Sequence, residues 1–202
     1  MEGFMGKFSI LIGFAIVVLL YSGASYYVGL KLLRWLEQLF PTINSFIFSL
    51  IYSFLAVTLI LSFLPFSGSL MHKITWLGSH WMGVFLYLLL FFVIIDIVFL
   101  VLKLIHVDVP PTMNFFGGLT VILLTVGLSS YGLYNGNQIN EVTYSVDLKD
   151  KASAAGVKLV FISDLHIGAV NSEKRLNDIV SKINNLEPDI VCIVGDIFND
   201  YY

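Results

Sequence analysis

Two short stretches near the C-terminus, VKLVFISDLHIG at residues 157–168 and DIVCIVGD at residues 189–196, decide how the polar part of the chain is built. Each contains a nearly continuous apolar run, over 157–162 in the first and 190–194 in the second. Such runs are typical of strands that are covered on both faces. The two stretches therefore predict two buried strands of an α/β domain.

The residues between the two strands predict a helix. The apolar residues recur at helical spacing and form one stripe: Leu176, Ile179, Val180, Ile183 and Leu186. Ser172 is placed to cap the start of this helix, and Pro188 to end it. A strand, a helix and a second strand at this spacing form a unit whose strands are parallel and joined by a right-handed crossover. The carboxyl ends of both strands are therefore expected at the same edge of the sheet.

Polar residues follow each strand at that edge. Asp164 and His166 come after the first strand, and Asp196 comes after the second. Open parallel sheets bind their ligands outside the carboxyl ends of the strands, so these residues are expected to converge. Carboxylate and imidazole groups suit divalent Mn, Fe or Zn, and one carboxylate can bridge two ions. Gly168 and Gly195 allow sharp turns beside the predicted ligands.

An Asp-x-His after one strand and a Gly-Asp after the next resemble the first two motifs of the calcineurin-like metallophosphoesterase superfamily. The closer resemblance is to its bacterial membrane-anchored branch. It implies an αββα sandwich that hydrolyses phosphate ester or pyrophosphate bonds with two divalent metal ions. By position, Asp164 and His166 would ligate the first ion and Asp196 would bridge both. No catalytic residue is identifiable beyond these metal ligands.

The resemblance covers only the last part of the chain. The later motifs of the family, Gly-Asn-His-Glu/Asp, a further His and Gly-His-x-His, have no counterpart before Tyr202. The second metal site is therefore expected to be incomplete here. Residues 135–202 are interpreted as the N-terminal part of a metallophosphoesterase domain, in a fragment or truncated gene product that is itself inactive. The full-length parent is expected to be the hydrolase, and a non-catalytic membrane fragment is the alternative for this chain.

The composition indicates a membrane protein. Hydrophobic residues make up 57% of the 202-residue chain and charged residues only 12%, against roughly 25% in soluble domains. No charged residue occurs from Thr42 to Met71, whereas residues 141–200 are rich in Lys, Asp and Glu. Residues 1–134 are therefore predicted to form the membrane region. A net charge of −3 without a dense Lys/Arg run gives no electrostatic footprint for nucleic acid.

Four stretches are long and apolar enough to cross a bilayer, at about 8–30, 43–64, 81–102 and 113–134. Residues 30–40 alternate apolar and charged side chains at helical spacing, which predicts a separate helix along the membrane surface. Residues 1–24 also resemble a signal peptide, an alternative that the continuing apolar run disfavours. Lys and Arg are divided almost evenly between the two sides, so the side of the membrane that carries the polar part stays undetermined.

The start of the polar part also has a strand pattern. Val142, Tyr144, Val146 and Leu148 alternate with polar residues, which is the period of a strand with one buried face. We expect this strand to lead from the fourth span into the domain. Because few residues separate the span from this strand, the metal site is expected close to the bilayer.

Asp96 is the one acid deep within a predicted span. An intramembrane carboxyl is a candidate for ion or proton handling, which would make the chain a transporter or channel. The alternative is an Asp that packs by hydrogen bonds against a Ser or Tyr of a neighbouring helix. The spans offer no second acid or base, which favours packing.

The predicted substrate follows from the presence of a membrane region that anchors the polar part. Confinement to a membrane raises the effective concentration of a substrate that is confined there too. A phosphoester or pyrophosphate on a lipid or lipid-linked carrier, or in an envelope polymer beside the membrane, is therefore expected, with the protein in a bacterial cell membrane. The alternative is an anchor that only sets location, with soluble phosphoesters as substrates.

Overall fold

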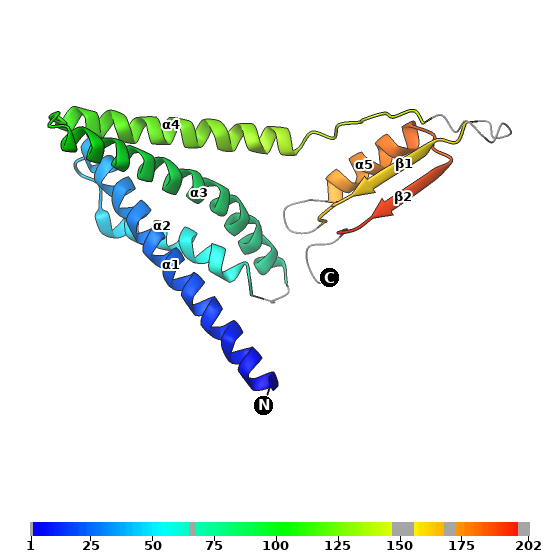
Figure 1. Cartoon of the computed structure of the whole chain (residues 1–202), viewed down its shortest axis with the longest axis horizontal. Coiled ribbons are helices and arrows are strands. Elements are labelled where there is room, and N and C mark those ends of the chain that lie inside the picture. The colour runs from blue at the N-terminus through cyan, green and yellow to red at the C-terminus, as the bar shows by residue number, and fades with distance from the viewer. Residues whose placement is uncertain (1, 65–67, 147–155, 168–172, 198–202) are drawn as a thin grey trace.

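The computed structural model describes residues 2–64, 68–146, 156–167 and 173–197, and Figure 1 draws the remaining residues in grey. The N-terminal region is a bundle of α1 (Glu2–Leu39), α2 (Ser45–Leu61), α3 (Ser69–Leu104) and α4 (Pro111–Gly136). A small α/β part follows, with β1 (Leu159–Ser163), α5 (Glu173–Asn185) and β2 (Ile190–Val194). The predicted fold class, membrane helices followed by the start of an α/β domain, is confirmed.

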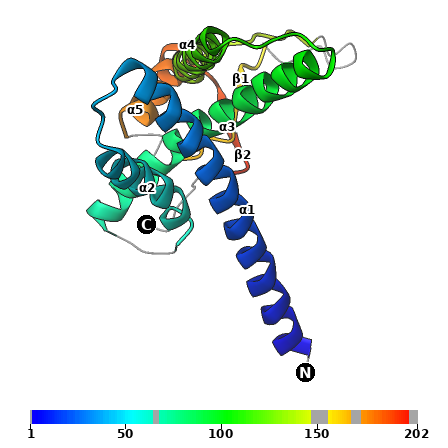
Figure 2. The same ribbon diagram turned by 90° about the vertical axis from the view of Figure 1, so that its left-hand side faces the viewer.

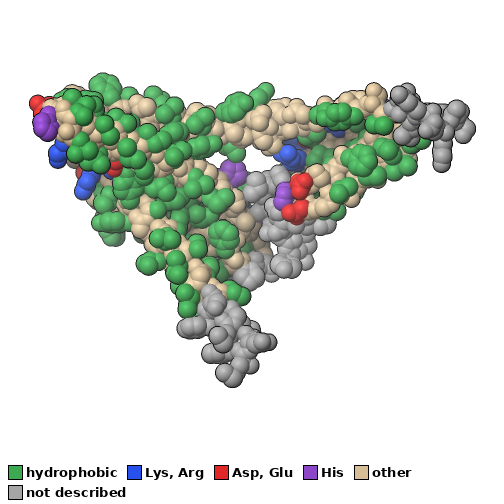
Figure 3. All heavy atoms as spheres, in the orientation of Figure 1, with side chains coloured by type: hydrophobic (Ala, Val, Ile, Leu, Met, Phe, Trp, Pro, Cys, Tyr) green, Lys and Arg blue, Asp and Glu red, His purple; other side chains and the backbone are tan. Residues whose placement is uncertain are grey.

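Three helices are long and apolar enough to cross a membrane: α1 from Ile10 onward, α3 and α4. The remaining apolar helix, α2, has 17 residues and is about 26 Å long, slightly less than the ~30 Å of a hydrocarbon core. The outer surface of the bundle is largely hydrophobic, as Figure 3 shows. The chain is therefore a membrane protein, and the prediction that α2 also spans the bilayer stays a prediction.

The core of the bundle is centred on α3, which contacts each of the other three bundle helices. It contributes Trp81, Phe85, Leu88 and Phe92, all buried. The other helices add Val28, Leu59 and Val121 to this cluster, and Trp35 of α1 is buried as well. The first half of α1 extends away from this core in Figures 1 and 2, and its apolar side chains from Ile10 to Leu20 are mostly exposed.

Two glycines allow the helices to approach closely. A Cβ atom on Gly78 of α3 would lie 2.6 Å from the backbone oxygen of Thr58 in α2. A Cβ atom on Gly118 of α4 would lie 2.1 Å from the Trp35 ring of α1. Both distances are shorter than any real carbon contact. Small residues at these positions are therefore required by the packing, as is common where membrane helices meet.

The prediction of a separate surface helix at residues 30–40 is wrong, because α1 continues without a break to Leu39. Nothing between Leu30 and Leu39 breaks a helix, and Pro41 follows its end. Trp35 is buried in the bundle, where its indole Nε1 donates to the backbone oxygen of Phe115 at 3.1 Å. The charged residues of this segment thus belong to a packed helix.

The two strands of the α/β part are parallel, as predicted. Their register pairs Leu159 with Ile190 at one end and Ser163 with Val194 at the other. The carboxylate of Asp189 helps to hold this register, because it accepts from the backbone N–H of Lys158 at 2.7 Å. The backbone N–H of Asp189 in turn donates to the Lys158 oxygen at 2.9 Å. Both strands therefore end at the same level.

The predicted strand at residues 142–148 is wrong over its described part. Residues 141–146 contain no strand, and Val142, Tyr144 and Val146 are all strongly exposed. An alternating pattern produces a strand only where another strand supplies hydrogen bonds. No described residue pairs with this segment, and residues 147 and 148 lie outside the described part of the chain.

The expectation that β1 and β2 are covered on both faces is also wrong within the described residues. Phe161 of β1 and Ile193 of β2 are exposed, whereas Val160, Ile162 and Cys192 are half-buried. The helix α5 runs alongside the strands in Figure 1 and cannot cover both faces of a sheet. Its apolar stripe is half-buried as predicted, except at the exposed Val180, and the predicted cap Ser172 lies outside the described residues.

Candidate metal centre

The aligned strand ends bring the predicted ligands to one edge of the sheet. Asp164 follows Ser163 at the end of β1, and Gly195 and Asp196 follow Val194 at the end of β2. Three residues at this edge have a left-handed backbone: Asp164 (φ 53°), His166 (φ 45°) and Gly195 (φ 74°). Glycine adopts this conformation freely, whereas other residues do so at some cost and often at functional sites. The predicted role of Gly195 in a sharp turn is confirmed.

His166 and Asp196 lie side by side. The backbone N–H of His166 donates to the backbone oxygen of Asp196 at 3.2 Å. The backbone N–H of Ile167 donates to the backbone oxygen of Ile197 at 2.8 Å. These bonds continue the pairing of β1 and β2 into the segments that follow the two strands. The imidazole Nδ1 of His166 is 3.5 Å from Oδ2 of Asp196. Half of each side chain is exposed, so both can reach a ligand from solvent.

The donor set fits a divalent ion only in part. One imidazole and one carboxylate meet, and these are suitable ligands for Mn, Fe or Zn. Asp164 follows β1 at the same edge and is exposed. It does not complete a site, because no group of three potential metal ligands occurs among the described residues. Figure 3 shows acidic and histidine side chains gathered at this end of the α/β part. Gly168 lies outside the described residues, and the ligand assignments stay predictions.

Sequence reasoning missed the contacts that hold α5 to the end of α4. Arg175 donates through a guanidinium nitrogen to the backbone oxygen of Gly136 at 2.7 Å. The ammonium of Lys182 donates to the backbone oxygen of Ile139 at 2.7 Å and lies 3.8 Å from the Glu141 carboxylate. Cations at the C-terminus of a helix are favoured by its free carbonyl groups and dipole. The only available signal was the spacing of Arg175 and Lys182 on one face of a helix.

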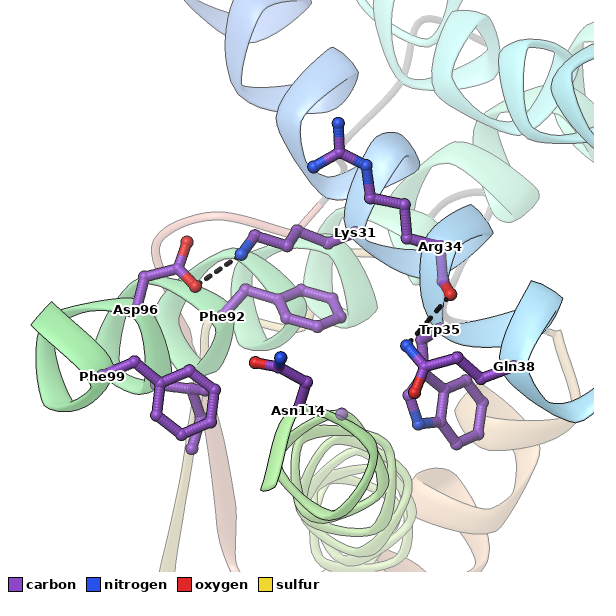
Figure 4. A pocket seen from close by; sticks show the side chains of 10 residues that line it. Lys31, Arg34, Trp35, Gln38, Phe92, Asp96, Phe99 and Asn114 are labelled. Carbon is purple, nitrogen blue, oxygen red and sulfur yellow. Dashed lines mark hydrogen bonds and ion pairs between the residues drawn. The ribbon is translucent and has the colours of Figure 1, made fainter. Parts of the chain in front are cut away.

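Asp96 lies far from this edge, in a polar cluster within the bundle. Its Oδ2 accepts from the Tyr27 hydroxyl at 2.7 Å, and its Oδ1 is 2.5 Å from the Lys31 ammonium. Figure 4 shows Lys31 reaching from α1 toward Asp96 on α3. The contact with Tyr27 supports the packing interpretation of Asp96. The statement that the spans offer no base is wrong, because α1 continues and carries Lys31 into the bundle.

Comparison with known proteins finds relatives whose names include the word metallophosphoesterase. A transmembrane protein with a metallophosphoesterase domain from Danio rerio is 39% identical to the chain over 79 residues, which is 38% of this chain and 18% of that protein. The protein of the same name from Bos taurus is 34% identical over the same shares. An uncharacterised metallophosphoesterase from Campylobacter jejuni is 33% identical over 81 residues, or 40% of this chain and 21% of that protein.

These relatives confirm the resemblance to the calcineurin-like metallophosphoesterase superfamily and support a membrane-associated phosphoesterase family of hydrolases. The chain spans about a fifth of the length of these relatives. They come from animals and from a bacterium, so they do not restrict the chain to a bacterial branch. No family model and no solved structure matches the chain.

Proposed function

We propose that this chain contributes the membrane anchor and the first metal-binding motifs of a phosphoesterase that hydrolyses phosphate ester or pyrophosphate bonds with two divalent ions. The observation that carries the proposal is the meeting of His166 and Asp196 at the aligned ends of two parallel strands. The metallophosphoesterase names of its relatives support the reaction class. In this proposal Asp164 and His166 bind the first ion, and Asp196 bridges both.

Divalent ions held at this site would stabilise negative charge on a phosphoryl group and would make a water molecule acidic enough to supply the hydroxide that attacks phosphorus. The residues of this chain have the task of holding the ions in place. A bridging carboxylate must reach outward from the sheet, and the turn at Gly195 directs the chain to Asp196 just beyond β2. The backbone bond between His166 and Asp196 joins the two motifs directly. A shift of either strand would therefore disturb both ligands together.

The proposed substrate carries its phosphate on a lipid or lipid-linked carrier. Arg175 and Lys182 hold α5 against residues 136–141, directly after the membrane helix α4. The α/β part is thereby kept near the membrane surface rather than on a free tether. A site held there encounters a membrane-bound substrate at a much higher effective concentration than one in solution.

The bridging assignment predicts that Asp196→Ala lowers metal content more than Asp164→Ala or His166→Ala. The reason is that a bridging carboxylate contacts two ions and the other ligands contact one. Metal content after dialysis against Mn²⁺ is measured by mass spectrometry, together with hydrolysis of a generic phosphodiester. These measurements use a chain that carries all motifs of the family in lipid nanodiscs. We expect Asp196→Ala to lose both ions and at least about a hundredfold in turnover.

Asp178→Ala is the matched control, because Asp178 is exposed on α5 and is not a predicted ligand. It should retain metal and turnover. If Asp196→Ala keeps both ions at near-normal turnover, the bridging role is wrong. If the unchanged protein binds no Mn, Fe or Zn and cleaves neither a monoester nor a diester, the proposed function itself is wrong.

A further inference from the structure

A partly open cavity of about 250 Å³, lined by polar and apolar side chains, lies between α1, α3 and the start of α4 (Figure 4). It is slightly smaller than the roughly 300–1,000 Å³ of ordinary ligand pockets. Lys31, Arg34 and Trp35 line it from α1, and Asp96 lines it from α3. Asn114 lines it from the first turn of α4. The metal centre does not share this cavity, because the α/β part is attached at the other end of α4.

The charges in the cavity do not balance. Lys31 and Arg34 supply two cations against the single carboxylate of Asp96. Lys31 contacts that carboxylate directly, whereas the guanidinium of Arg34 has no ion-pair partner among the described residues. Arg34 is exposed, so its charge is accessible to an anion from the surroundings. The cavity therefore has an excess of positive charge that an anion would neutralise.

The start of α4 adds to this positive character. Helix α4 begins after Pro110, and its first residue, Pro111, has no N–H. The N–H of Met113 donates to the Pro110 oxygen at 2.9 Å, so Thr112 supplies the one unpaired backbone N–H of the first turn among the described residues. The N-terminus of a helix carries a partial positive charge and is a common binding position for phosphate groups. The amide of Asn114 belongs to this first turn and makes no hydrogen bond to another described side chain. It offers a donor in the cavity that the two cations also line.

The remaining walls are apolar. Phe92, Ile95 and Phe99 of α3 line the cavity together with the Trp35 ring. The outer surface of the surrounding helices is hydrophobic and suits contact with acyl chains. A ligand with an anionic head and an apolar tail would match both halves of this environment. A metal cation would not, since the one carboxylate present is already held by Lys31 and Tyr27.

We propose that this cavity binds the phosphate group of an anionic amphiphile, such as the headgroup of a phospholipid in the surrounding leaflet. Asn114 and Gly136 are separated by 22 residue steps of α4, or about 33 Å along the helix. The site therefore lies toward the membrane side opposite the metal centre. Its ligand is a structural or regulatory lipid rather than the proposed substrate, and the inference does not depend on the proposed function.

The test measures binding of three probes to the 202-residue protein in a neutral detergent. The probes are dioctanoyl phosphatidic acid, dioctanoyl phosphatidylcholine and inorganic phosphate, and binding is followed by calorimetry and native mass spectrometry. We expect phosphatidic acid to bind at least about tenfold more tightly than either of the others. The reason is that the first probe alone combines net negative charge with an apolar tail.

Arg34→Gln is the main variant, because Arg34 is exposed and lacks an ion-pair partner, so its replacement should not unfold the bundle. We expect a loss of about tenfold in affinity for phosphatidic acid, and a smaller loss for Arg34→Lys. Lys103→Gln is the matched control. Lys103 is an exposed cation in the last turn of α3, at the same end of the bundle, but it does not line the cavity. It should bind phosphatidic acid like the unchanged protein.

Asp96→Asn tests the sign of the charge effect. Loss of this carboxylate removes repulsion of the phosphate and releases Lys31, so affinity for phosphatidic acid should rise several-fold. A purely structural role for the cluster predicts no rise. The proposal is overturned if Asp96→Asn lowers the affinity, or if Lys103→Gln loses as much as Arg34→Gln. Equal binding of inorganic phosphate would overturn the assignment to an amphiphile.

Discussion

At the scale of single residues, the packing of the bundle depends on glycines as much as on large apolar side chains. Gly78 brings α3 against the backbone of α2, and Gly118 brings α4 against Trp35. Neither position stood out in the sequence, because a glycine in an apolar helix predicts no particular partner. His166 and Asp196, in contrast, were singled out by their place after two strands, and the structure brings them together.

Gly78→Ala should destabilise the bundle by about 1–3 kcal/mol, the usual effect of forcing an extra methyl group into a packed interface. The added Cβ would meet the backbone oxygen of Thr58 at 2.6 Å, and a backbone atom cannot turn aside. Thermal unfolding in a mild detergent measures the change. Gly83→Ala, on the same helix with nothing within 4 Å, is the control and should be neutral or slightly stabilising. Equal stability of the two variants would contradict the proposed close contact.

At the scale of elements, the contact between α5 and the end of α4 couples the α/β part to the membrane. Its bonds join α5 to the carbonyl group of Gly136 at the end of α4 and to that of Ile139 just after it. They are exposed or half-exposed, and such charged contacts contribute only about 0–1 kcal/mol each to stability. These contacts therefore affect the orientation of the α/β part relative to α4 more than the free energy of folding.

Arg175→Ala combined with Lys182→Ala should therefore loosen the α/β part while leaving the unfolding temperature nearly unchanged. Spin labels at Leu128→Cys on α4 and Asn184→Cys on α5, with Cys192→Ser to remove the native thiol, report the distance between the helices. The distance distribution measured by pulsed spin resonance should broaden in the double variant. Lys174→Ala, an exposed cation on α5, is the control and should leave the distribution unchanged. A double variant as narrow as the control would show that these contacts do not position α5.

At the scale of the whole molecule, α4 separates two polar sites. The candidate metal centre belongs to the part that follows its C-terminus, and the cavity lined by Lys31, Arg34 and Asn114 lies near its N-terminus. The rest of the bundle is apolar on its surface and packs around α3. The molecule therefore has one candidate site near each end of α4.

The proposed lipid-linked substrate predicts that the membrane region raises catalytic efficiency for that substrate alone. Specificity constants are compared in nanodiscs for a lipid-linked phosphate and a soluble nucleotide, using a chain with all motifs of the family. The comparison is repeated after removal of residues 1–134. We expect removal to lower kcat/KM at least about tenfold for the lipid-linked phosphate and to leave the nucleotide unaffected. A preference for the nucleotide in both chains would contradict the lipid proposal. The membrane region would then only determine where the enzyme is located.

Local patterns in the sequence were enough to predict the membrane helices, the two parallel strands with their helix, and the edge where Asp164, His166 and Asp196 would lie. Helical and strand periodicity, helix-breaking prolines and the end of an apolar run are all short-range signals. The predicted strand at residues 142–148 had the same kind of signal and did not form over its described part. A strand depends on hydrogen bonds from a partner, which no local pattern supplies.

Tertiary structure alone decided which distant residues meet. Lys31 and Asp96 are 65 residues apart, and Arg175 and Gly136 are 39 apart. The sequence by itself determined that the chain has a membrane region and two motifs that resemble the first motifs of metallophosphoesterases. Only the packing of α1, α3 and α4 made a cavity with excess positive charge, and only the docking of α5 joined the α/β part to α4. The physical reason is that helix formation depends on neighbours within a turn, whereas ion pairs and cavities depend on how whole helices cross.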